Sequence, residues 1–528
     1  MAPEPWIPKL RAAPHLGPAI EVCLVVILAY LVVSYLRSPL KKYPGPFLAK
    51  FTNLWRMYRI SRRAYHKDLE KLHKKYGPVV QIAPNVIDVD YPELIKTVFN
   101  VKGDWKKTEF YLSSSALVNG QIVLNLFSEL DVVKHAQTKR PIAKHYSPSG
   151  VAAFEPHMDR TIQRLCDELE TRFMSTNKSG GASSEKEKPV VDLGEWILYY
   201  TWDVVGETTF SQPLGYLSAG HDFDGTLRNA DKAMDYFSWV GCIPILDRLL
   251  DKNPVVHLGP PGFGGIMALS VKRLIDRAQG KDKEFHDSSR PDYLDKFIEA
   301  KTANPDTVDD FQLVSWLMIN MIAGADTTAI TLRSAIYFSL WDKRIWTRLQ
   351  TELAAAGLTR DKCPLPYKET RAIPYLEAIV REALRILPAV SGCLERYVPS
   401  GGQRLPDGSF VPENCVVAFN PYVLGRNREV FGSDADEFKP ERWLQSDKES
   451  DDAFQTRLRA MNNADLSFGG GSRMCLGRHM GLMQVYKVVS TLAVRYDAEL
   501  AHPEKEWTVF NSFFPRQEGL EVRISKRN

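Results

Sequence analysis

The sequence predicts a mainly α-helical protein with a minor β region, joined to an apolar helix at its N-terminus. Residues 158–173 and 196–208 carry apolar side chains at the three- and four-residue spacing of a buried helix face. Residues 309–341 contain no proline and are rich in apolar side chains, which predicts one helix of about 50 Å. Residues 79–89 and 415–419 are short, β-branched or alternating, and bounded by Pro, Asn and Gly, which predicts a small sheet.

The composition limits the class of protein. The chain has 528 residues, of which 44% are hydrophobic and 25% charged, as in an ordinary globular protein with a substantial core. The net charge is only +4, which is too small to predict nucleic-acid binding. The seven cysteines are scattered and form no Cys-x-x-Cys pair, so neither a disulfide framework nor a zinc module is expected. We therefore expect the folded body in the cytosol.

The N-terminal apolar stretch is predicted to be a membrane anchor. Residues 22–36 are apolar, and the stretch extends to residue 19, which is marginal for a span. No small-x-small cleavage signal follows it, which favours an anchor over a removed signal peptide. The basic residues after the stretch outweigh those before it, so the positive-inside rule places the body in the cytosol. The predicted organisation is a lumenal N-terminus at 1–18, a transmembrane anchor at 19–36, a basic and Pro-rich hinge at 37–50, and a single domain at 51–528 with an exposed polar loop at 175–188.

The most specific pattern lies at residues 468–477, FGGGSRMCLG. It fits F-x-x-G-x-R-x-C-x-G at Phe468, Gly471, Arg473, Cys475 and Gly477, a match expected by chance about once in ten thousand such chains. Glycines let the backbone turn tightly, and backbone N–H groups aimed at the sulfur stabilise a thiolate. The pattern resembles the haem-ligand loop of cytochromes P-450, in which the cysteine is the axial ligand of the haem iron.

Three other interpretations of this loop are weaker. Cys475 can be a buried structural thiol beside a glycine turn. A phosphate-binding loop fails because neither G-x-G-x-x-G nor G-x-x-x-x-G-K-[ST] fits the glycine spacing. Cys475 and His479 stand one helical turn apart, but two ligands without a second pair do not make a structural zinc site.

A second motif, AGADTT at residues 323–328, lies in the middle of the predicted long helix. It resembles the oxygen-binding stretch of the same superfamily. The resemblance implies that Gly324 leaves room for dioxygen beside the haem and that Asp326 and Thr327 deliver protons. Thr327 can also compete for helix carbonyls and open the helix locally. Taken alone, the motif also allows a weaker interpretation, a threonine-rich helix interior with an exposed Asp.

Two further motifs occur between these two in the order that the superfamily has. Glu382 and Arg385 stand three residues apart on one helix face, where the default expectation is a weak surface ion pair. Pro440-Glu441-Arg442-Trp443 follows. The resemblance implies that Arg442 completes a buried Glu–Arg–Arg network that holds the cysteine loop.

The resemblance also assigns contacts to the haem propionates. It gives these contacts to Arg473 and to Arg396. Where many members have W-x-x-x-R, this chain has HAQTKR at residues 135–140. His135, with Lys139 or Arg140, is expected to replace those contacts, and the sequence leaves open which of the two basic residues does so.

The resemblance covers residues 42–522 and implies a haem b monooxygenase that oxidises a lipophilic small molecule with O2. No flavin or nicotinamide module is visible in the sequence. Electrons are therefore expected from a separate NADPH-cytochrome P-450 reductase, with cytochrome b5 as a second donor, docking on a basic face with Lys139, Arg140 and Lys144. The expected location is the endoplasmic reticulum membrane, with the catalytic domain in the cytosol.

Substrate contacts and subgroup are expected from the same likeness. By helical spacing, Leu317, Asn320, Gly324 and Thr328 share the face that would look at the haem, and Val390 and Phe513 are further pocket candidates. The loops are similar to those of microsomal fungal members, including the pisatin-demethylase-like group, which implies secondary metabolism or detoxification. Two alternatives are a haem-thiolate isomerase or dehydratase that works without O2, and a non-catalytic haem or gas-binding protein.

Overall fold

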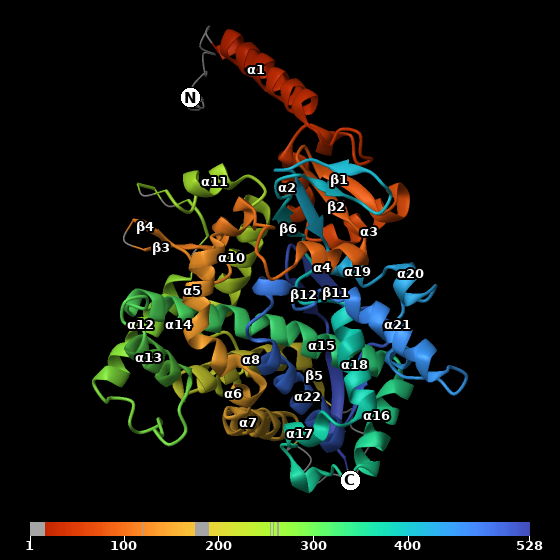
Figure 1. The fold of residues 1–528 in the computed structure, drawn as a ribbon. Helices are drawn as coiled ribbons and strands as arrows, with labels where there is room; N and C mark the ends of the chain where they lie inside the picture. Colours follow the sequence, from red (N-terminus) through yellow and green to blue (C-terminus); the bar gives the residue numbers. More distant parts are fainter. Residues whose placement is uncertain are drawn as a thin grey trace, which may run out of the picture.

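The computed structural model describes residues 16–118, 120–174, 189–253, 255–256, 258–260 and 263–527. The predicted loop at 175–188 lies outside the described residues. A helical body carries several small sheets, of which the main one lies near the end where the helix α1 projects (Figure 1). The predicted mainly α class with a minor β region is confirmed.

The helices of the body that have nine or more residues bury apolar stripes against one another. They are α2 (Asn53–Ser61), α3 (Tyr65–Tyr76), α5 (Val132–Ala143), α7 (Glu155–Phe173), α8 (Leu193–Phe210), α10 (Thr226–Val240), α12 (Gly264–Ala278), α13 (Tyr293–Ala303), α14 (Asp310–Gly324), α15 (Asp326–Trp341), α16 (Lys343–Ala355), α18 (Pro374–Ile386), α21 (Asp451–Asn463) and α22 (Arg478–Arg495). The shorter α-helices are α4 (Ile95–Val98), α6 (Pro148–Ala152), α9 (Tyr216–Ala219), α11 (Pro244–Leu249), α17 (Tyr367–Thr370), α19 (Pro421–Leu424) and α20 (Arg428–Phe431).

The predicted single helix at 309–341 is two helices, α14 and α15, separated at Ala325. Ala325 has φ −84° and ψ −67°, outside ideal helix geometry. The Thr327 hydroxyl donates to the carbonyl oxygen of Ala323 at 2.9 Å, so a side chain competes for a helix acceptor at the interruption. The predicted long helix is present with a one-residue interruption at Ala325, and the expected competition by Thr327 lies beside it.

The α14–α15 pair crosses the centre of the body, where α8 lies alongside it (Figure 1). Residues Asp310–Trp341 form the one stretch of the described chain that is long and apolar enough to cross a membrane. Half of its apolar window is buried inside the body, which identifies it as a core helix. Nearly every side chain of α8 is buried against it.

The main sheet has the order β1 (Val79–Ala83), β2 (Val86–Val89), β9 (Val416–Phe419) and β6 (Leu394–Tyr397). β1 and β2 are antiparallel, β2 and β9 are parallel, and β9 and β6 are antiparallel. All residues of β1, β2 and β9 are buried, which explains their short apolar runs. Both strand predictions, at 79–89 and 415–419, are confirmed.

The remaining strands form one three-stranded sheet and three hairpins. The three-stranded sheet has the order β10 (Tyr496–Leu500), β13 (Glu521–Lys526) and β5 (Val190–Asp192). The hairpins are β11 (Thr508–Asn511) with β12 (Pro515–Glu518), β3 (Ala116–Val118) with β4 (Gln121–Val123), and β7 (Gln403–Arg404) with β8 (Phe410–Val411).

The projecting helix α1 runs from Leu16 to Arg37 and contains the predicted anchor. Its described apolar side chains face solvent, with Val25, Leu28 and Tyr30 each more than 60% exposed. The apolar part that the structure describes, Leu24–Arg37, is shorter than a full span.

Candidate active site around Cys475

The cysteine loop is shaped by glycines that enter the left-handed region. Gly469 and Gly471 have φ of +67° and +59°. A Cβ on Gly471 would lie 2.2 Å from the carbonyl oxygen of Asn100, so no larger residue fits there. The backbone N–H of Cys475 donates to the carbonyl oxygen of Phe468 at 2.9 Å and closes the loop. Cys475 is thereby held just before the N-terminus of α22.

The Cys475 thiol is accessible although the protein surrounds it. Cys475 is exposed, whereas Cys166, Cys242, Cys393 and Cys415 are buried. Desolvation by the surrounding protein nevertheless raises the pKa of Cys475, and the N–H groups of Gly477 and Arg478 and the positive charge of Lys139 act in the opposite direction. A thiol that is open to water yet desolvated lies inside the body. The nearby N–H groups and positive charges are suited to a thiolate.

The centre of the long helix opens toward the same region. Ala323 is exposed and Thr327 is partly exposed, although their neighbours Met321, Ala325 and Ala329 are 0% exposed. The first turns of α22 lie close by, because a Cβ on Gly481 would sit 3.4 Å from the Thr328 hydroxyl. We infer that Cys475, Ala323 and Thr327 face one interior space, which we call the central hollow.

Asp326 lies beside the central hollow but turns its carboxylate toward α8. The indole N–H of Trp202 donates to Asp326 Oδ1 at 3.0 Å. Burial raises the pKa of Asp326 to about 7, and the negative charge of Asp231 raises it further. The Trp202 hydrogen bond and the charges of Arg333 and Arg516 lower it. An acid with a pKa near neutrality can take up and release protons at physiological pH.

Five basic side chains gather beside the cysteine loop without carboxylate partners. Among the described residues, no ion pair joins any of them to an acid; they are Lys107, His135, Lys139, Arg396 and Arg473. We call them the cationic cluster.

Burial and mutual repulsion lower the pKa values of four members of the cluster, Lys107, His135, Lys139 and Arg473. Burial lowers the pKa of His135 to about 3, and the charges of Arg473, Lys139 and Lys107 add to this effect. Burial and then Arg396 lower the pKa of Arg473 to about 10. Burial, Arg396 and Arg473 also lower the pKa of Lys107. Buried like charges without counterions are costly, so this arrangement fits a ligand that brings negative charge.

These residues fit a haem bound between the cysteine loop and the long helix. The iron would take the Cys475 sulfur, the donor that haem-thiolate proteins use. The two propionates would supply the negative charge that the cationic cluster lacks. The exposed Ala323 and Thr327 would face the opposite side of the ring.

Lys107 is a member of the cationic cluster that the sequence analysis missed. It is 7% exposed, and its ammonium lies 3.8 Å from the ring centroid of Tyr111. It also donates to the carbonyl oxygen of Phe127. No motif marks this lysine, so only its burial in the folded protein identifies it.

Of the two basic residues left open on α5, Lys139 joins the cluster and Arg140 does not. Lys139 donates to the carbonyl oxygen of Ser472 in the cysteine loop at 3.1 Å. Arg140 is exposed. A helix turns about 100° per residue, so the two side chains leave α5 in different directions, and a haem contact of Arg140 stays a prediction.

Two residues of the face expected to look at the haem are buried, and a third is hydrogen-bonded to neighbouring elements. Leu317 is 0% exposed, and Thr328 packs against α22. Asn320 accepts from the hydroxyl of Tyr146 at 2.9 Å and donates to the hydroxyl of Thr209 at 2.8 Å.

Gly324 also differs from its expected place. A Cβ on Gly324 would meet Val205 of α8 at 3.0 Å, so this glycine allows close helix packing. Ala323 takes the open position instead. The exposed position thus precedes the expected one by a single residue, and a role of Gly324 beside dioxygen stays a prediction.

The two remaining pocket candidates lie in an aromatic cluster. Phe513 is 2% exposed and packs with ring centroids 5.1 Å from Phe237 and 5.7 Å from Phe110. Val390 is partly buried against the same cluster. Phe513 is therefore core in this structure and not an open pocket wall.

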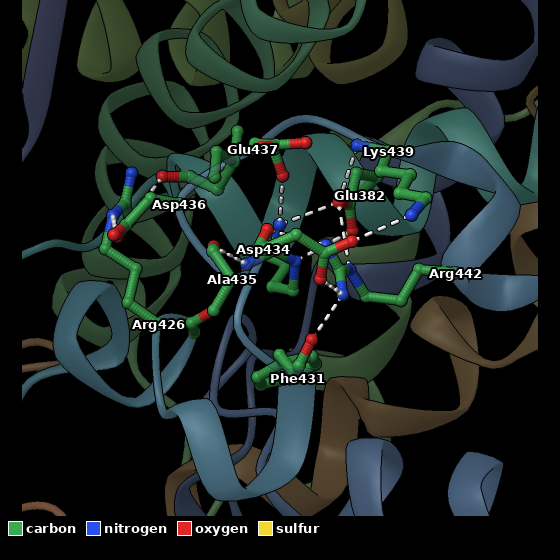
Figure 2. Close-up of polar contacts among 12 residues, drawn as sticks. Glu382, Arg426, Phe431, Asp434, Ala435, Asp436, Glu437, Lys439 and Arg442 are labelled. Carbon is green, nitrogen blue, oxygen red and sulfur yellow. Dashed lines mark hydrogen bonds and ion pairs between the residues drawn. The ribbon is translucent and has the colours of Figure 1, made fainter.

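Glu382, Arg385 and Arg442 form one buried network (Figure 2). Arg385 binds both oxygens of Glu382, at 2.7 and 2.6 Å, and Arg442 Nε lies 3.3 Å from Glu382 Oε1. The indole N–H of Trp443 donates to Glu382 at 2.8 Å. Glu382 is 0% exposed, so the default expectation of a weak surface pair does not apply.

Both arginines of this network also bind backbone carbonyl oxygens of residues 425–437. Arg385 donates to the carbonyls of Ala435 at 2.6 Å and Glu437 at 2.7 Å, and Arg442 donates to that of Asp434 at 2.9 Å. The network therefore ties α18 to the segment before the PERW motif.

Comparison with known proteins gives a consistent result. The family model for cytochrome P450 matches residues 43–522. The chain is 44% identical over 506 residues to cytochrome P450 monooxygenase cfoH of Aspergillus candidus, covering 96% of this chain and 92% of the relative. It is 32% identical to cytochrome P450 monooxygenase vrtE of Penicillium aethiopicum, covering 99% and 96% of the two chains. A third relative, cytochrome P450 monooxygenase cicH of Emericella nidulans, is 34% identical over 97% of this chain and 99% of its own. The chain belongs to the cytochrome P450 family and is a cytochrome P450 monooxygenase.

Proposed function

We propose that this monooxygenase inserts one oxygen atom of O2 into a lipophilic small molecule, by hydroxylation, demethylation or a related oxidation. The observation that carries the proposal is the central hollow, with the Cys475 thiol on one side and Ala323 and Thr327 on the other. Haem bound through Cys475 supplies the oxygen-activating chemistry. Thr327 and Asp326 hold and pass the protons that this chemistry consumes.

The biological setting belongs to the same proposal. The relatives named above are fungal, which supports a role in fungal secondary metabolism or detoxification. The narrower likeness to pisatin-demethylase-like enzymes remains a prediction from the sequence. Electrons would come from an NADPH-cytochrome P450 reductase, or from cytochrome b5, at the basic face that includes Lys139 and Lys144.

We also propose that α1 attaches this monooxygenase to a membrane. α1 has 22 residues, about 33 Å of helix, close to the thickness of a bilayer hydrocarbon core. Its exposed apolar side chains have no partner in the described body, which supports insertion into lipid. The proposed location is the endoplasmic reticulum, with the body in the cytosol.

A reconstitution experiment tests the function. The purified protein is mixed with NADPH-cytochrome P450 reductase and screened against lipophilic compounds for those that shift the haem spectrum. The proposal predicts NADPH- and O2-dependent product formation from at least one such compound. Turnover without reductase or O2 would favour an isomerase or dehydratase, and spectral binding without any turnover would favour a gas- or haem-binding protein.

A further inference from the structure

The contact between Trp202 and Asp326 is the strongest polar interaction beside the central hollow that no motif explains. Trp202 lies on α8 and is 1% exposed. Its indole N–H donates to Asp326 Oδ1 at 3.0 Å, across the interface of α8 with α15. An indole has a donor and no acceptor, so this bond favours an oxygen that carries negative charge.

Asp326 and Thr327 are adjacent in sequence but engage different partners. The Thr327 hydroxyl is partly exposed to the central hollow and donates to Ala323 at 2.9 Å. Asp326 directs Oδ1 to α8 while the side chain remains partly exposed. The carboxylate is thus held against α8 at the edge of the space where Thr327 would act.

Four charged or polar groups around Asp326 influence its pKa, and they come from four different elements. Trp202 comes from α8, Asp231 from α10, Arg516 from β12, and Arg333 from α15 itself. Asp231 and Arg516 form an ion pair at 3.3 Å in which the Asp231 side chain is 48% exposed. Through the partly exposed Asp231, the charged neighbourhood of Asp326 reaches solvent.

We propose that Trp202 is a positioning residue for proton transfer, which holds the Asp326 carboxylate against α8 in an ionisable state between solvent and Thr327. This inference rests on the proposed function, because it assumes that Asp326 relays protons to Thr327. Without the indole donor the carboxylate loses its fixed orientation and the interaction that favours its charged form. The pKa of Asp326 then rises, because the hydrogen bond from Trp202 lowers it.

The first test measures the hydrogen bond in the intact holoenzyme, without catalysis. Tryptophan indole N–H groups are labelled with ¹⁵N, and the Trp202 resonance among the 11 tryptophans is assigned by its loss in Trp202→Phe. The chemical shift of the Trp202 indole proton should change with pH near pH 7, as Asp326 ionises. This change should be absent in Asp326→Asn. A Trp202 resonance that is independent of pH in the wild type would overturn the proposal.

The second test compares two tryptophan substitutions. Trp316 of α14 is a matched control, because it is also fully buried and its indole nitrogen has no hydrogen-bond partner among the described residues. Infrared difference spectra, with Asp326→Asn as reference, report the protonation of the Asp326 carboxyl. Trp202→Phe should raise the pKa of Asp326, changing its ionisation constant about tenfold, and Trp316→Phe should leave it unchanged.

The amount of product formed per NADPH consumed distinguishes a failure of this inference from a failure of the proposed function. Trp202→Phe should lower the product formed per NADPH and move its pH profile to higher pH, while Trp316→Phe keeps the wild-type profile. If Asp326→Asn and Thr327→Ala uncouple the enzyme but Trp202→Phe behaves as Trp316→Phe, the inference fails and the function stands. If Asp326→Asn also leaves coupling intact, the relay itself is refuted.

Discussion

The residues of the site differ in how far chemistry alone could identify them. Cys475 and Arg473 sit in a motif that few chains match by chance, and the structure leaves the Cys475 thiol exposed, as a ligand of a bound group must be. Lys107 belongs to no motif and is identified only by its burial among other cations. Motif positions can be recognised from the sequence because they lie at a fixed short spacing. A charge cluster is assembled from segments far apart in the chain, so only the fold brings it together.

Asp326 should give the coupled reaction a pH dependence. Its pKa of about 7 means that roughly nine-tenths of the side chains are protonated at pH 6 and about one-tenth at pH 8. Because the protonated form donates, product per NADPH should fall as the pH rises through 7. Asp326→Asn should remove this limb and lower coupled turnover at least about tenfold. A limb that persists unchanged in the variant would assign it to another group.

Lys107 should lower the stability of the haem-free protein and raise the affinity of the protein for haem. Lys107→Met removes a buried cation that no acid neutralises, so the haem-free protein should unfold at an equal or higher urea concentration. The holoprotein should lose haem to apomyoglobin at least about tenfold faster, because one contact to a propionate is gone. The exposed neighbour serves as control, and Lys106→Met should change neither measurement. Faster haem loss in both variants would argue against the cluster.

At the scale of elements, the buried network should dominate the stability of the α18 region. Glu382→Gln leaves two buried arginines without their shared carboxylate, a loss of about 3–5 kcal/mol in the free energy of unfolding. Glu377→Gln on the same helix removes a surface pair with Arg371, worth under about 1 kcal/mol. Urea titrations of the two holoproteins provide the comparison. Equal losses would mean that the network contributes no more than a surface pair.

The long helix shows where sequence reasoning about elements stops. Its existence followed from apolar content and the lack of proline, and its interruption lies beside the hydroxyl that was expected to compete with the backbone. The sequence did not indicate which residue takes the exposed position, because Ala323 and Gly324 are both small and periodicity cannot decide between them. Only the packing of Val205 against Gly324 selects the orientation.

For the whole molecule, α1 should determine where the protein is found but not whether it folds. A chain that starts after Arg37 should leave the membrane fraction and keep its haem, since α1 lies apart from the body (Figure 1). Placing lysines at Val25 and Leu28 in the full chain should have the same effect, because each charge costs about 2.5–3.5 kcal/mol at a membrane centre. Sedimentation of lysed cells measures how much protein stays in the membrane fraction. The spectrum of the reduced carbon monoxide adduct measures whether haem is retained. A truncated chain that stays with membranes would point to a second attachment surface.

The arginines of the Glu382 network recognise residues 425–437 largely through carbonyl oxygens, which every amino acid possesses. These hydrogen bonds depend on the path of the backbone and hardly on which side chains residues 425–437 carry. Exposed positions of this stretch, such as Glu429 and Ser433, can therefore change without loss of the anchor, whereas Gly425 cannot, because a Cβ there would lie 2.4 Å from the carbonyl oxygen of Arg385.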